Sequence, residues 1–375
     1  MRILVAPDSF GGTLSALEAA AAICAGWSRA VPGDELDLAP LSDGGPGFIE
    51  VLHTSMGGDR RSVTVSGPLG GEIEATYLLH DGSAYVESAQ AAGLHLVPPE
   101  QRDPLRATAV GVGQLLAAAL ASGARRVVVG LGGSATNDGG AGLLTPLGVG
   151  LLDSEGEPLP PGGAALAQLA EVRPADWAAG PPRGVEVLAA TDVDNPLLGP
   201  QGASVVFGPQ KGASPADVLR LEAALAHFAD LLERDWPAAA PHRAEPGGGA
   251  AGGMGYALFA LGACRRSGID LVLAATGLPD RVAAADLVIA GEGSFDWQSL
   301  RGKAVSGVAR AATEAGVPCI VLAGQTAVGG RELRAAGVTA AYSVAEAAGS
   351  VQAAMARPAV ELGNLAEWVA RTWTR

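Results

Sequence analysis

The sequence predicts an α/β protein of two domains, with the first domain assembled from both ends of the chain. Apolar strand-like runs alternate with helical segments near the N-terminus and in the last third, as expected of parallel strands buried on both faces. Residues 62–88 instead contain short segments of alternating polarity, which are typical of an antiparallel meander. We therefore expect a parallel-sheet domain at residues 1–66 and 268–375 and an inserted α/β domain at residues 67–267.

The composition limits the classes of function. The chain has 375 residues, of which 48% are hydrophobic, so it can bury a core in each domain. A net charge of −14 without a basic stripe argues against nucleic-acid binding. No apolar run reaches the ~18 residues of a membrane helix. Three distant cysteines and the lack of a secretory signal at the start indicate a cytoplasmic protein with reduced thiols.

The first domain is expected to open with a strand at residues 2–6 and a helix at residues 13–31, for which Thr13 is the expected N-cap. Apolar periodicity and turn residues bound the other elements of this domain. They are a strand at 34–41, a helix at 48–55, a strand at 285–293, a helix at 303–316 and a strand at 317–325.

The inserted domain is expected to begin with three meander strands at residues 62–67, 72–79 and 83–89. Its clearest helix is the amphipathic segment 214–236, opened by Ser214 with Pro215 in the first turn. The other expected elements are a helix at 105–123, strands at 124–131 and 185–194, and a loop at 241–255.

Five of the predicted strands end in loops rich in carboxylates, hydroxyls or glycine. In open α/β sheets, ligands bind beyond the carboxyl ends of the strands, so this repetition indicates a ligand site. Each loop taken alone is more typical of a simple turn than of a ligand site. The loops are PDS at 7–9, SDGG at 42–45, GGSATNDGG at 132–140, TDVDNP at 191–196 and GEGSFD at 291–296.

The loop at residues 132–140 has the composition of a phosphate site. Glycine-rich backbone exposes amide groups to phosphate oxygens, and Ser134 and Thr136 add hydroxyl donors. The preceding GLGGSA also matches a dinucleotide fingerprint, which leaves a nicotinamide dehydrogenase as an alternative. However, the Asn-Asp-Gly-Gly that follows would delay the helix which that fingerprint requires. The chain contains neither a P-loop motif nor the G-x-S-x-G elbow of serine hydrolases.

Lys211 and Lys303 are the only lysines of the chain, and both lie in glycine-flanked polar segments. A compact ammonium charge suits a phosphate or carboxylate ligand. We expect a ligand role for Lys303 and leave the role of Lys211 open between ligand binding and structure. The five histidines show no metal-binding spacing.

Taken in order, the loops resemble the class I glycerate kinase family. The matching segments are APDSF, PLSDGG, GLGGSATNDGGAG, ATDVDNPLLGPQGAS, FGPQKGA, GGGAAGGMG and AGEGSFDWQSLRGKAV. The resemblance implies a discontinuous Rossmann-like parallel-sheet domain, an inserted mixed α/β domain and an active site in the cleft. It also implies transfer of the γ-phosphoryl group of ATP to a small-molecule substrate, D-glycerate, with Mg²⁺ as cofactor and 2-phosphoglycerate as the expected product.

Phosphoryl transfer requires metal-held phosphates, positive charge and a base for the attacking hydroxyl. We expect Asp192 or Asp296 to act as the base and Lys303 to complete the catalytic group. For Asp194, the turn-forming sequence DNP gives an equally good structural explanation. The remaining expected site residues are Asp8, Ser9, Asp43, Arg301 and Lys211 for the substrate, Gly132, Gly133, Ser134, Thr136 and Asn137 for ATP, and Asp138, Asp194 and Glu292 for the metal.

The chain departs from the usual family pattern in three loops. Gly11 stands where a lysine is usual, and Ser294 where an arginine is usual, which weakens the expected binding of an anion. Pro46 and Phe48 replace a glutamate and a threonine, and Trp297 is an added bulky side chain. We expect Phe48 and Trp297 to make the cleft more apolar. A kinase for another small hydroxy acid, or a catalytically weak nucleotide-binding or regulatory homologue, therefore stays open as an alternative.

Overall fold

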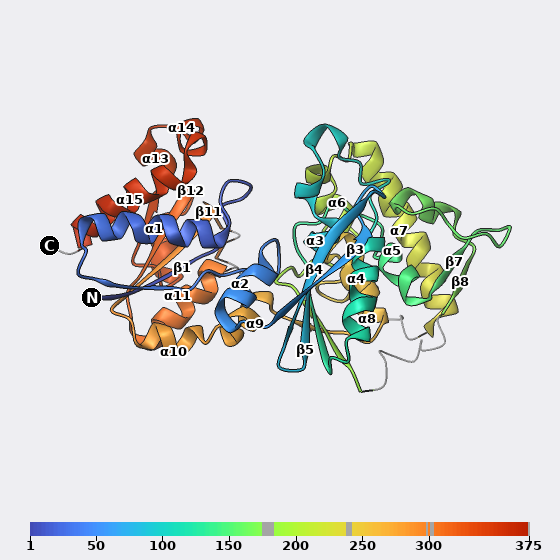
Figure 1. The fold of residues 1–375 in the computed structure, drawn as a ribbon. Helices are drawn as coiled ribbons and strands as arrows, with labels where there is room; N and C mark the ends of the chain where they lie inside the picture. Colours follow the sequence, from blue (N-terminus) through green and yellow to red (C-terminus); the bar gives the residue numbers. More distant parts are fainter. Residues whose placement is uncertain (175–183, 238–241, 298, 301–303, 374–375) are drawn as a thin grey trace. The chain divides into compact units, whose positions relative to one another are not determined.

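The computed structural model describes residues 1–174, 184–237, 242–297, 299–300 and 304–373, and the chain divides into two compact units (Figure 1). Both ends of the chain belong to the same unit, which confirms the predicted discontinuous α/β domain. Unit 1 comprises Met1–Asp43, Glu50–Met56 and Ile269–Arg375, and unit 2 comprises Gly44–Ile49 and Gly57–Gly268.

Unit 1 is built on a five-stranded sheet in which every pairing is parallel. Helices cover both faces of this sheet (Figure 1). In spatial order the strands are β13 (Ala340–Ser343), β12 (Cys319–Thr326), β11 (Leu287–Phe295), β1 (Arg2–Pro7) and β2 (Glu35–Leu38). The helices are α1 (Ala16–Ala30), α9 (Gly268–Ala275), α10 (Leu278–Ala283), α11 (Ala304–Ala315), α12 (Gly330–Ala335), α13 (Val344–Ala348), α14 (Val351–Ala356) and α15 (Pro358–Trp373). Of α2 (Phe48–Met56), residues 50–56 belong to unit 1 and the first two residues to unit 2.

The strand order reverses between β1 and β11. From β1 the chain continues to β2 on one side, whereas β11 is followed by β12 and β13 on the other side. Loops that leave neighbouring parallel strands in opposite directions leave a crevice at the carboxyl ends of those strands. The sheet order therefore marks the β1–β11 edge of unit 1 as a place for a ligand.

Helix α1 begins later than the sequence suggested. Its N-cap is Ser15, whose Oγ accepts a hydrogen bond from the Glu18 amide while the Glu18 carboxylate accepts one from the Ser15 amide. Thr13, the expected cap, instead donates its hydroxyl to the Phe10 carbonyl. The reciprocal capping box satisfies two backbone donors, which a single Thr13 cap could not.

Unit 2 contains a six-stranded mixed sheet. Strands β10, β9, β6 and β5 are parallel, and β4 and β3 are antiparallel, so the predicted meander is confirmed. The strand β3 pairs with β4 along its whole length, which places residues 59–66 in unit 2 rather than in the first domain as expected. In spatial order the strands are β10 (Cys264–Arg266), β9 (Glu186–Ala190), β6 (Arg126–Gly130), β5 (Ser83–Glu87), β4 (Glu72–His80) and β3 (Asp59–Ser66).

The helices of unit 2 lie beside this sheet, and a small ribbon of two strands lies apart from it (Figure 1). Helix α7 has the predicted cap, because Ser214 accepts a hydrogen bond from the Asp217 amide and Pro215 occupies the first turn. Its apolar face buries Leu221, Phe228 and Leu232. The elements are α3 (Ala89–Ala92), α4 (Val110–Ala121), α5 (Ala141–Leu144), α6 (Ala203–Phe207), α7 (Pro215–Asp235), α8 (Ala250–Ala260), β7 (Gly150–Leu152) and β8 (Glu171–Arg173). None of the helices in the described part of the chain combines the length and hydropathy needed to cross a membrane.

The packing of α1 on α15 requires glycine at residue 26. A Cβ atom at Gly26 would lie 2.0 Å from the carbonyl oxygen of Gly363 on α15, so the two backbones touch here. Trp27 and Ile23 on α1 and Leu365 and Val369 on α15 are buried around this contact.

We predict that Gly26→Ala destabilises the protein by about 1–3 kcal/mol, because the added methyl group must push α1 away from α15. Helix propensity alone would favour alanine by about 1 kcal/mol, so a loss of stability identifies the close contact. Urea denaturation followed by circular dichroism measures the free energy of unfolding.

The matched control is Gly33→Ala, because no described atom lies within 4 Å of a Cβ at that residue and its φ is negative. The control should change stability by less than about 0.5 kcal/mol. Equal effects of the two substitutions would contradict the proposed packing constraint.

Candidate active site

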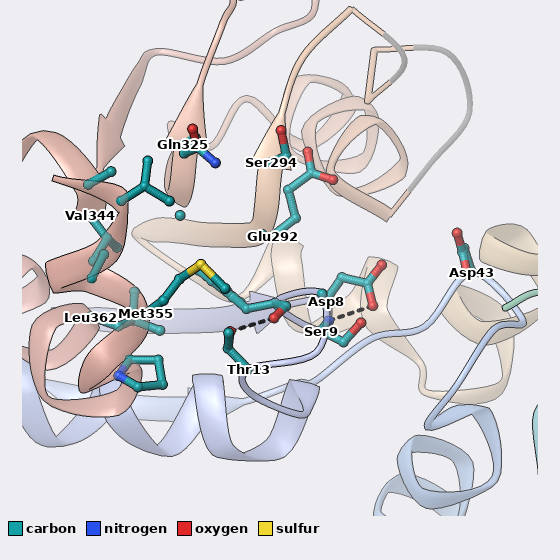
Figure 2. Close-up of a pocket in the computed structure, with 18 residues that line it drawn as sticks. Asp8, Ser9, Thr13, Asp43, Glu292, Ser294, Gln325, Val344, Met355 and Leu362 are labelled. Atoms are coloured by element: carbon teal, nitrogen blue, oxygen red, sulfur yellow. Dashed lines mark hydrogen bonds between the residues drawn. The ribbon is translucent and has the colours of Figure 1, made fainter. Parts of the chain in front are cut away.

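A cavity of about 440 Å³ opens at the carboxyl ends of β1, β11 and β12 in unit 1 (Figure 2). It lies at the position marked by the reversal of strand order. Three of the predicted polar segments reach it: Asp8 and Ser9 from 7–9, Asp43 from 42–45, and Glu292 and Ser294 from 291–296. The last of these was expected to be a loop, but β11 continues to Phe295 because Glu292 and Ser294 still pair with β12. The sequence-based expectation that strand-end loops gather polar side chains therefore holds within this unit.

The cavity has two chemically different sides. Figure 2 shows Val344, Met355 and Leu362 together on one side, with Asp8, Ser9 and Asp43 on the other. The apolar side comes from α13, α14 and the start of α15, which the sequence analysis did not connect with a site. The sequence gives no sign that these helices line a cavity, because apolar side chains on short helices usually belong to a core.

Local hydrogen bonds hold the polar side in place. The Asp8 amide donates to the Gly291 carbonyl at 2.8 Å, which fixes the first loop to the middle of β11. The Asp8 carboxylate accepts the Ser9 amide at 2.6 Å, and Thr13 Oγ1 closes the loop onto the Phe10 carbonyl at 2.5 Å. In the described part of the chain no atom lies within 4 Å of a Cβ at Gly11, the residue where the sequence resemblance led us to expect a lysine.

The predicted loops of unit 2 also meet at strand ends. Glu87 on β5, Gly130 on β6 and Ala190 on β9 lie at the same level of the sheet. The loops that follow contain Gly132–Gly140 and Thr191–Pro196, and Gly44–Gly47 packs beside them. A Cβ at Gly132 would lie only 2.7 Å from the Cα of Gly45.

Glu87 is a residue of this region that the sequence analysis missed. Its side chain is buried and accepts hydrogen bonds from the Gly47 amide at 3.2 Å and the Ile49 amide at 3.1 Å. These amides open α2, whose first turn would otherwise leave buried donors without partners. A carboxylate at the end of a predicted strand was visible in the sequence, but its target 38 to 40 residues away was not.

The glycine-rich loop is largely buried. Thr136 and Asn137 are fully buried and Ser134 nearly so, whereas Gly132 is half-buried and Gly133 exposed. The Asn137 amide group donates to Ser204 Oγ at 2.9 Å, and Thr136 Oγ1 donates to the Ala251 carbonyl at 3.3 Å. Of the five residues expected to hold ATP, Gly132 and Gly133 alone present substantial surface.

Lys211 supports this loop from inside. Its side chain is 3% exposed, and Nζ donates to the Thr136 carbonyl at 2.6 Å and to Ser134 Oγ at 3.1 Å. Burial lowers the pKa of the Lys211 ammonium to about 7, and the negative charge of Asp138 acts in the opposite direction. The geometry favours a structural explanation for Lys211, one of the two explanations that the sequence left open.

Asp138 organises the backbone of the same loop. One carboxylate oxygen accepts the Ala109 amide at 2.8 Å and the Gly142 amide at 3.3 Å, and the other accepts the Gly140 amide at 3.1 Å. Burial raises the pKa of Asp138, while these backbone hydrogen bonds lower it. Both oxygens are thus engaged with the protein.

The segment 241–255 was expected to be a loop, but helix α8 begins at Ala250. Its first residues adopt left-handed backbone angles, and φ is +72° at Gly252. A Cβ at Gly252 would lie 1.9 Å from the Thr136 carbonyl oxygen. The Gly252 carbonyl accepts a hydrogen bond from the Gly139 amide at 2.9 Å. The glycines of this motif therefore allow backbone to pack directly on the glycine-rich loop.

The remaining predicted site residues fall on both units. Asp192 and Asp194 follow β9 in unit 2, and the Asp194 side chain, 80% exposed, pairs with Arg265 at 2.5 Å. Asp296 follows β11 in unit 1, where its carboxylate accepts the Ser299 amide at 3.4 Å. Arg301 and Lys303 lie outside the described residues. The expectation of one shared cleft stays a prediction.

One departure from the family pattern does not act as expected from the sequence. Phe48 is fully buried, and its ring meets Tyr85 edge-on at 6.3 Å between centroids, so it cannot line a cleft. Trp297 is 60% exposed and does not line the cavity of unit 1, so its expected effect on a cleft stays a prediction. The apolar side of the unit 1 cavity comes from α13 to α15.

The described residues contain no cluster of three or more His, Cys, Asp or Glu side chains arranged to hold a metal ion. A Mg²⁺ ion bound with ATP usually takes one or two protein carboxylates, with phosphates and water completing its shell. Of the three expected ligands, Glu292 lines the cavity, whereas Asp138 is engaged by backbone amides and Asp194 by Arg265.

Comparison with known proteins places the chain among kinases. The model of the glycerate kinase family matches residues 3–374. Glycerate kinase of Bacillus subtilis is 45% identical over 92% of this chain and 90% of its own length, and glycerate 2-kinase of Escherichia coli is 41% identical over 94% and 93%. A crystal structure assigned as glycerate kinase 2 from Salmonella typhimurium LT2 superposes with a TM-score of 0.79 at 41% identity, covering 100% of this chain and 98% of that one.

We predict that Lys211 titrates near pH 7, far below the ordinary lysine value of 10.5. The unfolded chain then binds more protons than the folded chain between pH 7 and pH 10.5, so the contribution of this group makes folding more favourable as pH rises through that window. The slope is at most about 1.4 kcal/mol per pH unit.

NMR of protein labelled with ¹³C at the lysine ε-carbon tests this directly, because the chain has only two lysines. Lys303→Arg removes the second signal and serves as the assignment control. A midpoint near pH 10.5 for the remaining signal would show that Lys211 is solvated rather than buried.

Proposed function

This chain belongs to the glycerate kinase family, and from this membership we infer that it phosphorylates glycerate with ATP as the phosphoryl donor. The observation that carries the inference is the extent of the match. The family model spans residues 3–374, and named glycerate kinases align over most of both chains.

We propose that the product is 2-phosphoglycerate, as the name of the Escherichia coli relative suggests for that enzyme.

We also propose that Mg²⁺ accompanies ATP and that Glu292 is the carboxylate of this chain that holds it. When bound, Mg²⁺ neutralises charge on the phosphates. The position of Glu292 in the wall of the cavity supports this choice, whereas Asp138 is buried and accepts hydrogen bonds from backbone amides.

For the transfer itself, we propose that Asp296 or Asp192 accepts the proton of the attacking hydroxyl. Each follows a parallel strand at its carboxyl end, where ligands bind in α/β sheets. Lys303 is proposed to stabilise negative charge on the transferred phosphoryl group. Arg301 is proposed to bind an oxygen of the acceptor carboxylate or of a phosphate. In unit 2, the accessible backbone of Gly132 and Gly133 is proposed to contribute amide donors.

We predict that the purified protein converts D-glycerate and MgATP to ADP and 2-phosphoglycerate. Coupled detection of ADP measures turnover, and ³¹P NMR distinguishes the 2-phosphate from the 3-phosphate. A panel of other small hydroxy acids tests acceptor range, since Gly11 leaves open space where a cation is usual. Turnover on another acid with none on glycerate would overturn the proposed function.

We predict that Lys303→Ala and Asp296→Asn each lower kcat by about 10²-fold or more, because one removes positive charge and the other a proton acceptor. Asp192→Asn, assayed beside them, identifies which aspartate is the base. Asp270→Asn is the matched control, because Asp270 is exposed and pairs with Arg310 on the surface of unit 1. Wild-type kcat in all three site variants, with unchanged circular dichroism, would show that the catalytic assignment is wrong.

A further inference from the structure

We propose that the cavity of unit 1 binds the adenine nucleoside of ATP rather than the acceptor acid. The inference rests on the proposed kinase function, which supplies ATP as a ligand. It assigns a substrate class to the cavity at the carboxyl ends of β1, β11 and β12 and gives a role to helices α13 and α14.

The apolar side of the cavity suits a flat heteroaromatic ring. Val344, Ala354 and Leu362 line it, and Met355 stands at its rim with 59% of its surface exposed. A large apolar side chain held at the mouth of a cavity gains free energy when a ligand covers it. Glycerate has no apolar surface to offer, whereas adenine has two apolar faces.

The charges on the polar side point in the same direction. Asp8, Asp43 and Glu292 line the cavity, and none of the described lining residues is Lys, Arg or His. Their carboxylate oxygens can accept hydrogen bonds from hydroxyl groups of a ligand. A nucleoside is neutral, and its ribose hydroxyls can donate hydrogen bonds to carboxylates, as in dinucleotide-binding folds.

The size and place of the cavity agree with this ligand. Its volume of about 440 Å³ lies in the range of nucleotide-sized pockets and far exceeds a three-carbon acid. It also lies where the strand order reverses, which is where open α/β sheets hold nucleotides. Under this proposal, Asp8, Ser9 and Asp43 serve the nucleoside instead of the acceptor role that the sequence suggested.

Alkylation of an introduced thiol tests the proposal in the full-length protein. Met355→Cys places a thiol at the rim, in a Cys264→Ser background that removes the exposed native thiol. The other two native thiols react slowly, because burial raises the pKa of Cys24 to about 11 and of Cys319 to about 12. Val360→Cys is the control, because Val360 is exposed on α15 and does not line this cavity.

MgADP at about ten times its Kd should slow maleimide labelling of Met355→Cys about tenfold and leave Val360→Cys unchanged. D-Glycerate and inorganic tripolyphosphate should protect neither thiol. Protection by glycerate or by tripolyphosphate would overturn the assignment to the nucleoside. Unchanged labelling under MgADP, in a protein that still phosphorylates glycerate, would also overturn it while leaving the kinase function intact. If MgADP still protects the thiol but the protein does not phosphorylate glycerate, the kinase function is overturned and the nucleoside site remains.

Discussion

The parallel pairing of β1 with β11 is the constraint on which the site of unit 1 depends. Pro7 lies opposite Gly291, so Asp8, just beyond the end of β1, lies beside Glu292, which is still within β11. The hydrogen bond from the Asp8 amide to the Gly291 carbonyl continues this register one residue beyond β1. Side chains alternate between the faces of a strand, so a slip of one residue would turn these groups away from each other.

In unit 2, buried charged side chains hold the predicted phosphate loop in place. Asp138 gathers three backbone amides, and Lys211 holds the Thr136 carbonyl and Ser134 hydroxyl. Fixing a glycine-rich backbone costs conformational entropy, and each of these hydrogen bonds offsets part of that cost. The loop is thereby shaped before any ligand arrives, which leaves Gly132 and Gly133 as its accessible part.

The architecture and the polar strand ends could be predicted from the sequence, because the periodicity of apolar residues and the choice of turn residues are local properties. It did not predict which polar residues are buried. Lysine and aspartate are residue types that also occur in ligand sites. Only the fold shows that Lys211 binds the Thr136 carbonyl and that Asp138 binds backbone amides. Phe48 was misjudged for the same reason, since its burial depends on Tyr85 in a distant strand. The apolar wall of α13 and α14 had no sequence signal, because its neighbours are remote in the chain.

The reversal of strand order in unit 1 creates the proposed nucleoside site. Hydrogen–deuterium exchange of the full-length protein with and without MgADP tests it most directly. With MgADP bound, exchange should slow at residues 8–13, 323–326 and 344–356, where the cavity wall would be covered. Protection confined to residues 131–138, with no change around the cavity, would contradict it.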